Sequence, residues 1–251
     1  MIPQLELYDG CLMIIFLFII YFFGILYVQK KKKQEPIYRY FLSGLTIKIV
    51  GGIVYALYHA YVYKGGDTFV FYNAAQDLAN YLSFSDPSTF GAYFSGFNPS
   101  EYDFSPDYSY ILKGTDVLFI VKLTCLFYFI AGGSYFVITI LFSFLSFLGL
   151  WYAFITFSRL YESLSYSFFI VIFCVPTMTL WSSGLLKDTV TIGAIGWLIY
   201  GFSNLFIFNQ KFFKSFFHIL FSSFLIFMLK SYLIYLLYPA FFIWVQSNIK
   251  S

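Results

Sequence analysis

The apolar positions along the chain gather into seven long runs, separated by short polar segments and by one long polar segment. A helix needs roughly 20 mostly apolar residues to cross the hydrocarbon layer of a bilayer. The runs therefore predict an all-α fold, a polytopic transmembrane bundle of about seven spans. The predicted spans are residues 10–29, 41–62, 134–157, 166–182, 189–208, 215–229 and 231–247.

A shorter apolar stretch, residues 117–131, contains Lys122 and predicts a re-entrant or interfacial helix rather than a crossing. It follows the only long hydrophilic segment, residues 63–116. This segment opens with "GGDTFVFYNAAQDLANYL", in which two glycines permit a sharp exit from the second span. After Asp67 the apolar residues recur at helical spacing, which predicts an amphipathic helix on the membrane surface.

The rest of the long segment is rich in Pro, Gly, Ser and Tyr and predicts an irregular loop. Its acidic residues Glu101, Asp103 and Asp107 match no calcium-loop spacing, which favours a solvated segment. The chain is thus expected to have three parts. They are two N-terminal spans with a basic loop (1–62), an outer loop with interfacial helices (63–133) and a five-span bundle (134–251).

The composition supports a membrane protein, because 60% of the residues are hydrophobic and only 11% are charged. A soluble domain would carry about a quarter charged residues. The net charge of +3 is too small to indicate a nucleic-acid partner. Three scattered cysteines and two histidines give no disulfide framework and no His/Cys metal pattern.

The distribution of lysine and arginine predicts the orientation of the bundle. The segment "QKKKKQEPIYR" after the first run places lysines 30–33 in the cytoplasm and the N-terminus outside. Alternation from there puts ten of the fifteen basic residues inside, with Lys48 snorkelling to the cytoplasmic face, and puts the C-terminus in the cytoplasm. Glu6 and Asp9 precede the first run, which predicts a retained span rather than a signal peptide. Many Phe, Ile, Tyr and Lys beside only two arginines suggest an AT-rich bacterial genome. The expected location is therefore the inner membrane of a bacterium.

This topology brings charged residues from three separate segments to the outer boundary: Asp67, Lys187, Asp188 and Lys230. Ionisable groups close to the hydrocarbon are costly and often mark a site. A purely structural explanation exists for each of them. Asp67 and Asp188 are favourable helix starts, Lys187 has access to lipid phosphates, and Lys230 ends a span.

Three further residues are weaker candidates. Lys122 lies in an apolar stretch and needs a partner or a route to the interface. His59 lies two turns before Asp67, close enough to share a cleft, although a packed histidine with one hydrogen bond is the commoner case. His218, close to the cytoplasmic end of its span, is expected to be structural.

The order of these features resembles the type-C membrane glycosyltransferases, which use polyprenyl-phosphate sugars. The matching segments run from about residue 50 to 208 and include "GGDTFVFYNAAQDLANYL", "VLFIVKLTCLFYFIAGGS" and "SFFIVIFCVPTMTLWSSGLLKD". In that family, a span leads to an outer loop with an acidic start, an interfacial helix, and a later acidic residue in a short outer loop. Here Thr68 follows Asp67 where the family usually has a second carboxylate, and one additional span comes first.

The resemblance implies a function and roles for the site residues. A sugar is transferred from a polyprenyl-phosphate donor to a glycan, lipid or protein acceptor on the outer side. Asp67 is implied as the general base, and Asp188 as a residue that orients the acceptor or, with Asp67, holds Mg²⁺ or Mn²⁺. Lys187 and Lys230 are implied to bind the phosphate. Lys122 and His59 are weaker candidates for binding the substrate.

Two other classes of protein stay open from the sequence. One is a repeat-unit polymerase of the cell envelope, or a lipid-linked glycan transferase of unrelated fold. The other is a non-enzymatic membrane subunit or scaffold that works with partner chains. Convergence of Asp67, Lys187, Asp188 and Lys230 around one cleft favours an enzyme, whereas scattered positions favour the scaffold.

Overall fold

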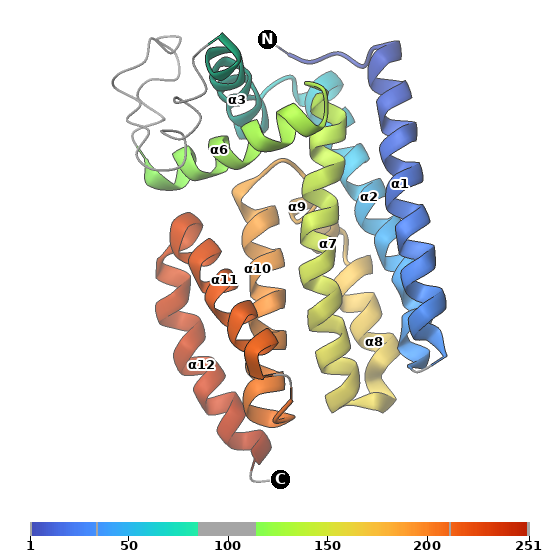
Figure 1. The fold of residues 1–251 in the computed structure, drawn as a ribbon, viewed down its shortest axis with the longest axis vertical. Coiled ribbons are helices and arrows are strands. Elements are labelled where there is room, and N and C mark those ends of the chain that lie inside the picture. Colours follow the sequence, from blue (N-terminus) through green and yellow to red (C-terminus); the bar gives the residue numbers. More distant parts are fainter. Residues whose placement is uncertain (1, 34, 85–113, 211, 250–251) are drawn as a thin grey trace.

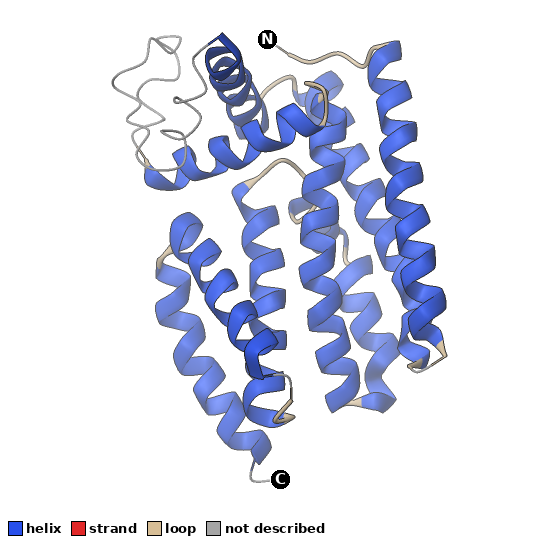
Figure 2. Cartoon of the chain, viewed as in Figure 1, coloured by secondary structure: helices blue, strands red, loops and turns tan. Residues whose placement is uncertain are grey.

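The computed structural model describes residues 2–33, 35–84, 114–210 and 212–249. Within these ranges the chain forms ten α-helices joined by short 3₁₀ and π-helical segments and turns, with no strand (Figure 2). The predicted all-α class is confirmed.

Five helical stretches are long and apolar enough to cross a membrane. They are α1 (Leu7–Lys32), α2 (Phe41–Leu57), α7 (Tyr135–Leu160), α10 (Lys187–Phe202) and α11 (Phe212–Lys230). The turns η1 (Pro36–Tyr40) and η2 (Tyr58–Tyr63) extend α2 at its two ends, and η7 (Ser203–Ile207) extends α10. These helices run alongside one another in Figure 1. Five of the predicted spans are thus confirmed as candidate membrane crossings.

The other two predicted spans, residues 166–182 and 231–247, are shorter helices. The first is divided into α8 (Ser165–Phe169), a π-helical turn (Ile170–Cys174) and α9 (Pro176–Trp181). The break falls at Val175, which is extended (φ −65°, ψ 119°) because a following proline disfavours the helical region. The second forms α12 (Tyr232–Ile249). Both lie alongside the five long helices in Figure 1, and the count of seven spans stays a prediction.

The outer surface of the bundle suits a lipid environment. Helices α1, α11 and α12 expose large apolar side chains, among them Phe18, Phe217 and Phe242. Water would make such a continuous apolar surface an aggregation site, whereas lipid tails cover it without cost. The exposed apolar face and the five long apolar helices together define an integral membrane protein.

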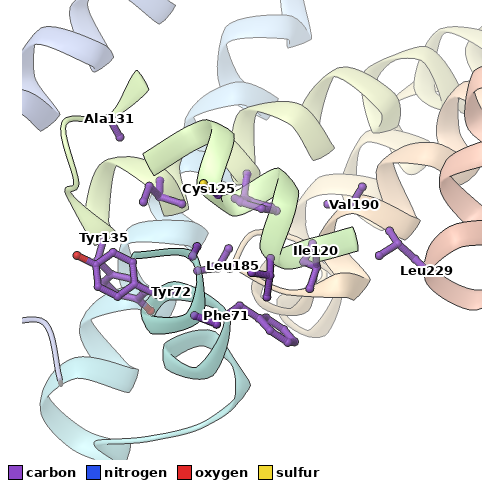
Figure 3. Packing of buried hydrophobic residues seen from close by; sticks show 14 of the residues in the cluster. Phe71, Tyr72, Ile120, Cys125, Ala131, Tyr135, Leu185, Val190 and Leu229 are labelled. Atoms are coloured by element: carbon purple, nitrogen blue, oxygen red, sulfur yellow. The ribbon is translucent and has the colours of Figure 1, made fainter. Parts of the chain in front are cut away.

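Two helices lie across one end of the bundle, α3 (Asp67–Phe84) and α6 (Thr115–Ile130) (Figure 1). α6 crosses the end of the bundle rather than running along it, as predicted for residues 117–131. The buried faces of α3 and α6 contribute to one hydrophobic core, to which Phe71, Ile120, Leu185 and Val190 belong (Figure 3). This packing fixes the beginnings of both helices over the beginning of α10.

Helices α7 and α10 approach each other closely at three glycines. A Cβ atom built on Gly149 would lie 1.9 Å from the carbonyl oxygen of Gly193, and one on Gly196 would lie 2.2 Å from the carbonyl oxygen of Gly149. Only glycine permits this approach, in the manner of small-residue interfaces between membrane helices. The contact holds α10, which carries Lys187 and Asp188, against the middle of the bundle.

Charged residues are divided between the two ends of the bundle. At the end that carries lysines 30–32, Arg159 Nη2 donates to both carboxylate oxygens of Glu35, at 2.8 and 3.0 Å. Asp67 lies at the opposite end, where α3 begins (Figure 1). The relative placement of the basic loop and Asp67 agrees with the predicted topology, and which end faces the cytoplasm stays a prediction.

Candidate functional site

A cavity of about 320 Å³ lies where α3, α6 and α10 begin and α11 ends. We call it the charged cavity. Its lining includes Asp67, Phe71, Asp116, Lys187, Asp188 and Lys230. Four of the six predicted site residues, drawn from three separate segments, therefore share one cavity; their chemical roles stay predictions.

Lys187 and Asp116 form the first ion pair of this cavity, with Nζ 2.6 Å from Oδ2. Partial burial raises the pKa of Asp116. The hydrogen bond from Lys187 and its positive charge lower this pKa by more, so the pKa of Asp116 lies below its ordinary value. The Lys187 ammonium also lies 5.8 Å from the centroid of the Phe71 ring. The sequence analysis did not select Asp116, because an aspartate in the first turn of a helix is an ordinary feature.

Lys230 and Asp188 form the second ion pair, in which Nζ of Lys230 donates to Oδ1 of Asp188. Asp188 lies in the first turn of α10 and Lys230 in the last turn of α11. Each charge therefore also complements the dipole of its own helix. The pair ties the beginning of α10 to the end of α11.

Asp67 is the charged side chain of the cavity that stays without an ion pair. Among the described residues, no basic group lies within 4.0 Å of its carboxylate, which is exposed. The predicted sharp turn before it is present, since Gly66 has φ +101° and Phe69 N–H donates to the Gly66 carbonyl at 3.1 Å. Asp67 is thus held at a fixed helix start with a carboxylate available to a ligand.

Three helix N-termini surround the charged cavity: those of α3, α6 and α10. The N-cap residues of α6 and α10 are Gly114 and Leu186, and neither supplies a side-chain cap. Their first backbone N–H groups carry the positive end of a helix dipole, which favours an anion. Together with two ammonium groups, these termini offset the negative charge of three aspartates.

The turn before Lys187, residues 182–186, is held from inside the bundle by Lys48. The Lys48 side chain is fully buried, and its Nζ donates to the carbonyl oxygen of Ser182 and, at 2.5 Å, to Oγ of the same residue. Ser143 Oγ donates to the carbonyl of Ser183. The expected snorkelling of Lys48 to the cytoplasmic face is therefore wrong, because acceptors within the bundle satisfy its ammonium.

A second cavity of about 590 Å³, the aromatic cavity, adjoins the first between α2 and α9. Its lining includes Tyr55, Tyr58, Tyr63 and Trp181, and it shares Asp67 and Leu186 with the charged cavity. His59 lines it too, donating from Nδ1 to the Tyr55 carbonyl at 3.0 Å. The histidine is thus placed beside the predicted site, although its single hydrogen bond also fits a structural role.

The remaining candidates lie elsewhere. Lys122 is half-buried on α6, where burial lowers the pKa of its ammonium, and it is not part of the lining of the charged cavity. Nδ1 of His218 donates to the Lys214 carbonyl at 2.7 Å, in agreement with a structural role. The acidic residues Glu101, Asp103 and Asp107 lie outside the described residues.

The predicted divalent cation fits the described residues poorly. They contain no group of three or more His, Cys, Asp or Glu side chains that would hold a metal ion. Oδ1 of Asp188 already accepts a hydrogen bond from the Lys230 ammonium, which competes with a cation for that carboxylate. A role of Asp67 and Asp188 in binding Mg²⁺ or Mn²⁺ stays a prediction, and no chemical step below depends on one.

No protein-family model matches the sequence, and no curated protein or solved structure matches the chain with significant similarity. The class that the described residues define is an all-α integral membrane protein with a charged cavity at one end of its helix bundle. The resemblance to type-C glycosyltransferases rests on the order of sequence features alone.

Proposed function

We propose that the protein transfers a sugar from a polyprenyl-phosphate donor to an acceptor at the outer face of a bacterial inner membrane. The observation that carries the proposal is the meeting of Asp67, Lys187, Asp188 and Lys230 at one cavity. A scaffold subunit would have no need for three aspartates and two lysines around one cavity at the end of its bundle. The convergence therefore favours an enzyme over a structural subunit.

The two adjoining cavities suit an amphipathic donor. The aromatic cavity is lined by tyrosines and Trp181, side chains that pack against apolar chains and tolerate the membrane boundary. The charged cavity adjoins the aromatic cavity at Asp67 and Leu186, which line both. A lipid phosphate would place its chain against the aromatic lining and its head among the lysines.

The lysines retain donors for a phosphate despite their ion pairs. Lys187 and Lys230 each donate to one aspartate, and an ammonium group has three N–H donors. The aspartates hold both ammonium groups in place before the donor binds. In the reaction, the same groups would stabilise the charge that develops on the departing phosphate.

Asp67 is the group suited to accept a proton. Its carboxylate is free of ion pairs among the described residues and faces both cavities. It would take the proton of an acceptor hydroxyl while the hydroxyl oxygen forms a bond to the anomeric carbon. As this bond forms, the bond between that carbon and the phosphate oxygen breaks, and polyprenyl phosphate leaves with the bonding electron pair. Asp188, in the same lining, would orient the acceptor.

Replacement of Asp67 and of Asp188 by asparagine tests the proposal in the bacterium that carries the gene. Each variant should lose a surface glycan at an unchanged level of membrane-inserted protein. Asp77→Asn provides a matched control, since Asp77 lies on the same helix as Asp67 but outside the lining of the charged cavity. Wild-type glycan in both Asp67→Asn and Asp188→Asn cells would end the glycosyltransferase proposal.

A further inference from the structure

A larger cavity, of about 640 Å³, lies at the opposite end of the bundle, and nothing in the proposed reaction uses it. We call it the basic-end cavity. It is formed by the connection from α1 to α2, the end of α7, the start of the α8 segment and the residues after η7. Its polar lining includes Glu35, Arg39, Ser158, Arg159, Glu162 and Gln210. A volume of this size is typical of small-molecule sites.

Both arginines of this cavity retain unused hydrogen-bond donors. Arg159 uses only Nη2 for its ion pair with Glu35, and Nε and Nη1 donate to none of the described residues. Arg39 donates from Nη2 to the Tyr40 hydroxyl at 2.7 Å, and no described carboxylate lies within 4.0 Å of its guanidinium. A guanidinium group presents five N–H donors, so most of these donors face the cavity or solvent.

Ser158 supplies an independent sign of a ligand. The residue is 2% exposed, and its hydroxyl has no partner among the described residues. On the same helix Thr139 and Thr156 donate to the carbonyls four residues earlier, whereas the Ser146 hydroxyl is also buried without a partner among the described residues. Of the two unpartnered serines, Ser158 is the one that lines the basic-end cavity. A buried hydroxyl without a partner is costly, and a ligand oxygen in the basic-end cavity would satisfy it.

We propose that the basic-end cavity binds a phosphodiester group. Paired guanidinium groups match the geometry of phosphate oxygens, and the Ser158 hydroxyl adds a third donor. Glu35 pairs with Arg159, and the second carboxylate of the lining, Glu162, forms no ion pair with either guanidinium among the described residues. This balance of two carboxylates and two guanidinium groups favours a phosphodiester monoanion over a phosphate dianion.

Two sources supply this chemistry, an anionic phospholipid headgroup of the adjoining leaflet and a soluble phosphodiester. Phosphatidylglycerol and its deacylated headgroup, glycerophosphoglycerol, distinguish them because they share the phosphodiester and differ in the lipid chains. Binding of both with similar Kd indicates a soluble ligand, whereas binding of the lipid alone indicates a headgroup site. The site is independent of the sugar-transfer proposal, because its residues lie at the other end of the bundle.

Native mass spectrometry of the detergent-solubilised full chain, with each probe titrated, tests the site. Arg39→Gln should weaken binding about tenfold, the usual effect of removing a charged hydrogen bond, and Ser158→Ala several-fold. Lys214→Gln is the matched control, because it removes a cation that lies over the Tyr152 ring and outside the cavity lining.

Failure of the wild-type protein to bind either probe overturns the proposal. Unchanged affinity in both Arg39→Gln and Ser158→Ala overturns it too, as does an equal loss in Lys214→Gln. Ser158→Ala removes only an oxygen atom, and Arg39→Lys keeps the charge while losing the planar fork. These two variants decide the question if Arg39→Gln does not fold.

Discussion

Lys187 Nζ lies 2.6 Å from Oδ2 of Asp116, although 71 positions of the sequence separate the two residues. The contact joins the first turn of α10, at the end of the bundle, to the first turn of α6, which crosses that end. It also leaves Asp67 as the carboxylate of the charged cavity without an ion pair among the described residues. Before a ligand binds, Lys187 and Asp116 are therefore paired with each other, and Asp67 is not paired with either lysine of the cavity.

This ion pair should make stability depend on pH in the acidic range. The pKa of Asp116 is lower in the folded protein than its ordinary value of about 3.9. The pair therefore stabilises the fold above that ordinary pKa, and the stabilisation is lost as the pH falls through the folded pKa. The Asp116 side chain is 41% exposed, so solvent screening limits the effect to about 1 kcal/mol or less.

Thermal unfolding in detergent between pH 6 and pH 3, for the wild type and Asp116→Asn, checks this expectation. The variant should melt at a lower temperature than the wild type at pH 6, and the difference should close as the pH falls. Parallel pH profiles for the two proteins would contradict a stabilising role of the pair.

The long apolar helices were predictable because their signal is contained within each segment. For α1, α7 and α11, a long apolar run that ends at a basic residue is enough to indicate a helix and its approximate bounds. The division of residues 165–181 was less accessible, because a proline in an apolar run is compatible with both a kink and an end. The seven-span prediction consequently merged α8 and α9 into one element.

The candidate site was predictable only in part, because its residues act through partners distant in sequence. Topology alone places Asp67, Lys187, Asp188 and Lys230 at one boundary. From the sequence alone, Asp116 cannot be distinguished from any other first-turn aspartate, because its partner Lys187 lies 71 positions away on another helix. Likewise, the direction of the Lys48 side chain depends on Ser182, 134 positions away, which no local pattern reveals.

A second prediction concerns the proposed general base. Asp67→Asn should lower kcat about 10²–10⁴-fold, the usual contribution of a positioned base, while the KM for the lipid donor changes little. The reason is that the lysines, not Asp67, are expected to hold the donor phosphate. Release of polyprenyl phosphate by the purified variant measures both constants. A rise in KM with unchanged kcat would instead assign Asp67 to substrate binding.

A third prediction concerns the buried ammonium of Lys48. Lys48→Met removes two hydrogen bonds to Ser182 and leaves a buried carbonyl without its donor, at an expected cost of about 1–3 kcal/mol. Because the 182–186 turn precedes Lys187, the variant should also lower transfer activity in the protein that stays folded. Lys32→Met, an exposed lysine at the end of α1, is the control. Equal melting temperatures for Lys48→Met and the control would show that the buried contact contributes nothing.

A fourth prediction tests the orientation of the bundle. In a protein whose native Cys11, Cys125 and Cys174 are replaced, single cysteines at Lys64 and Lys33 report on the two ends. A membrane-impermeant thiol reagent added to intact cells should label Lys64→Cys, and it should label Lys33→Cys only after the membrane is opened. Labelling of both positions in intact cells would refute the predicted topology.

The last prediction concerns the close contact of α7 and α10. Gly149→Ala would place a methyl group 1.9 Å from the Gly193 carbonyl oxygen, so the two helices must move apart. Overpacking of this kind costs about 1–3 kcal/mol, and here it also shifts the helix that carries Lys187 and Asp188. Gly10→Ala is the matched control, because a Cβ on Gly10 of α1 meets no atom within 4 Å. Alanine in place of a helical glycine there should instead stabilise the fold by about 0.5–1 kcal/mol. Melting temperatures that move in opposite directions for the two variants are therefore expected, whereas a shared upward shift would contradict the glycine-mediated contact.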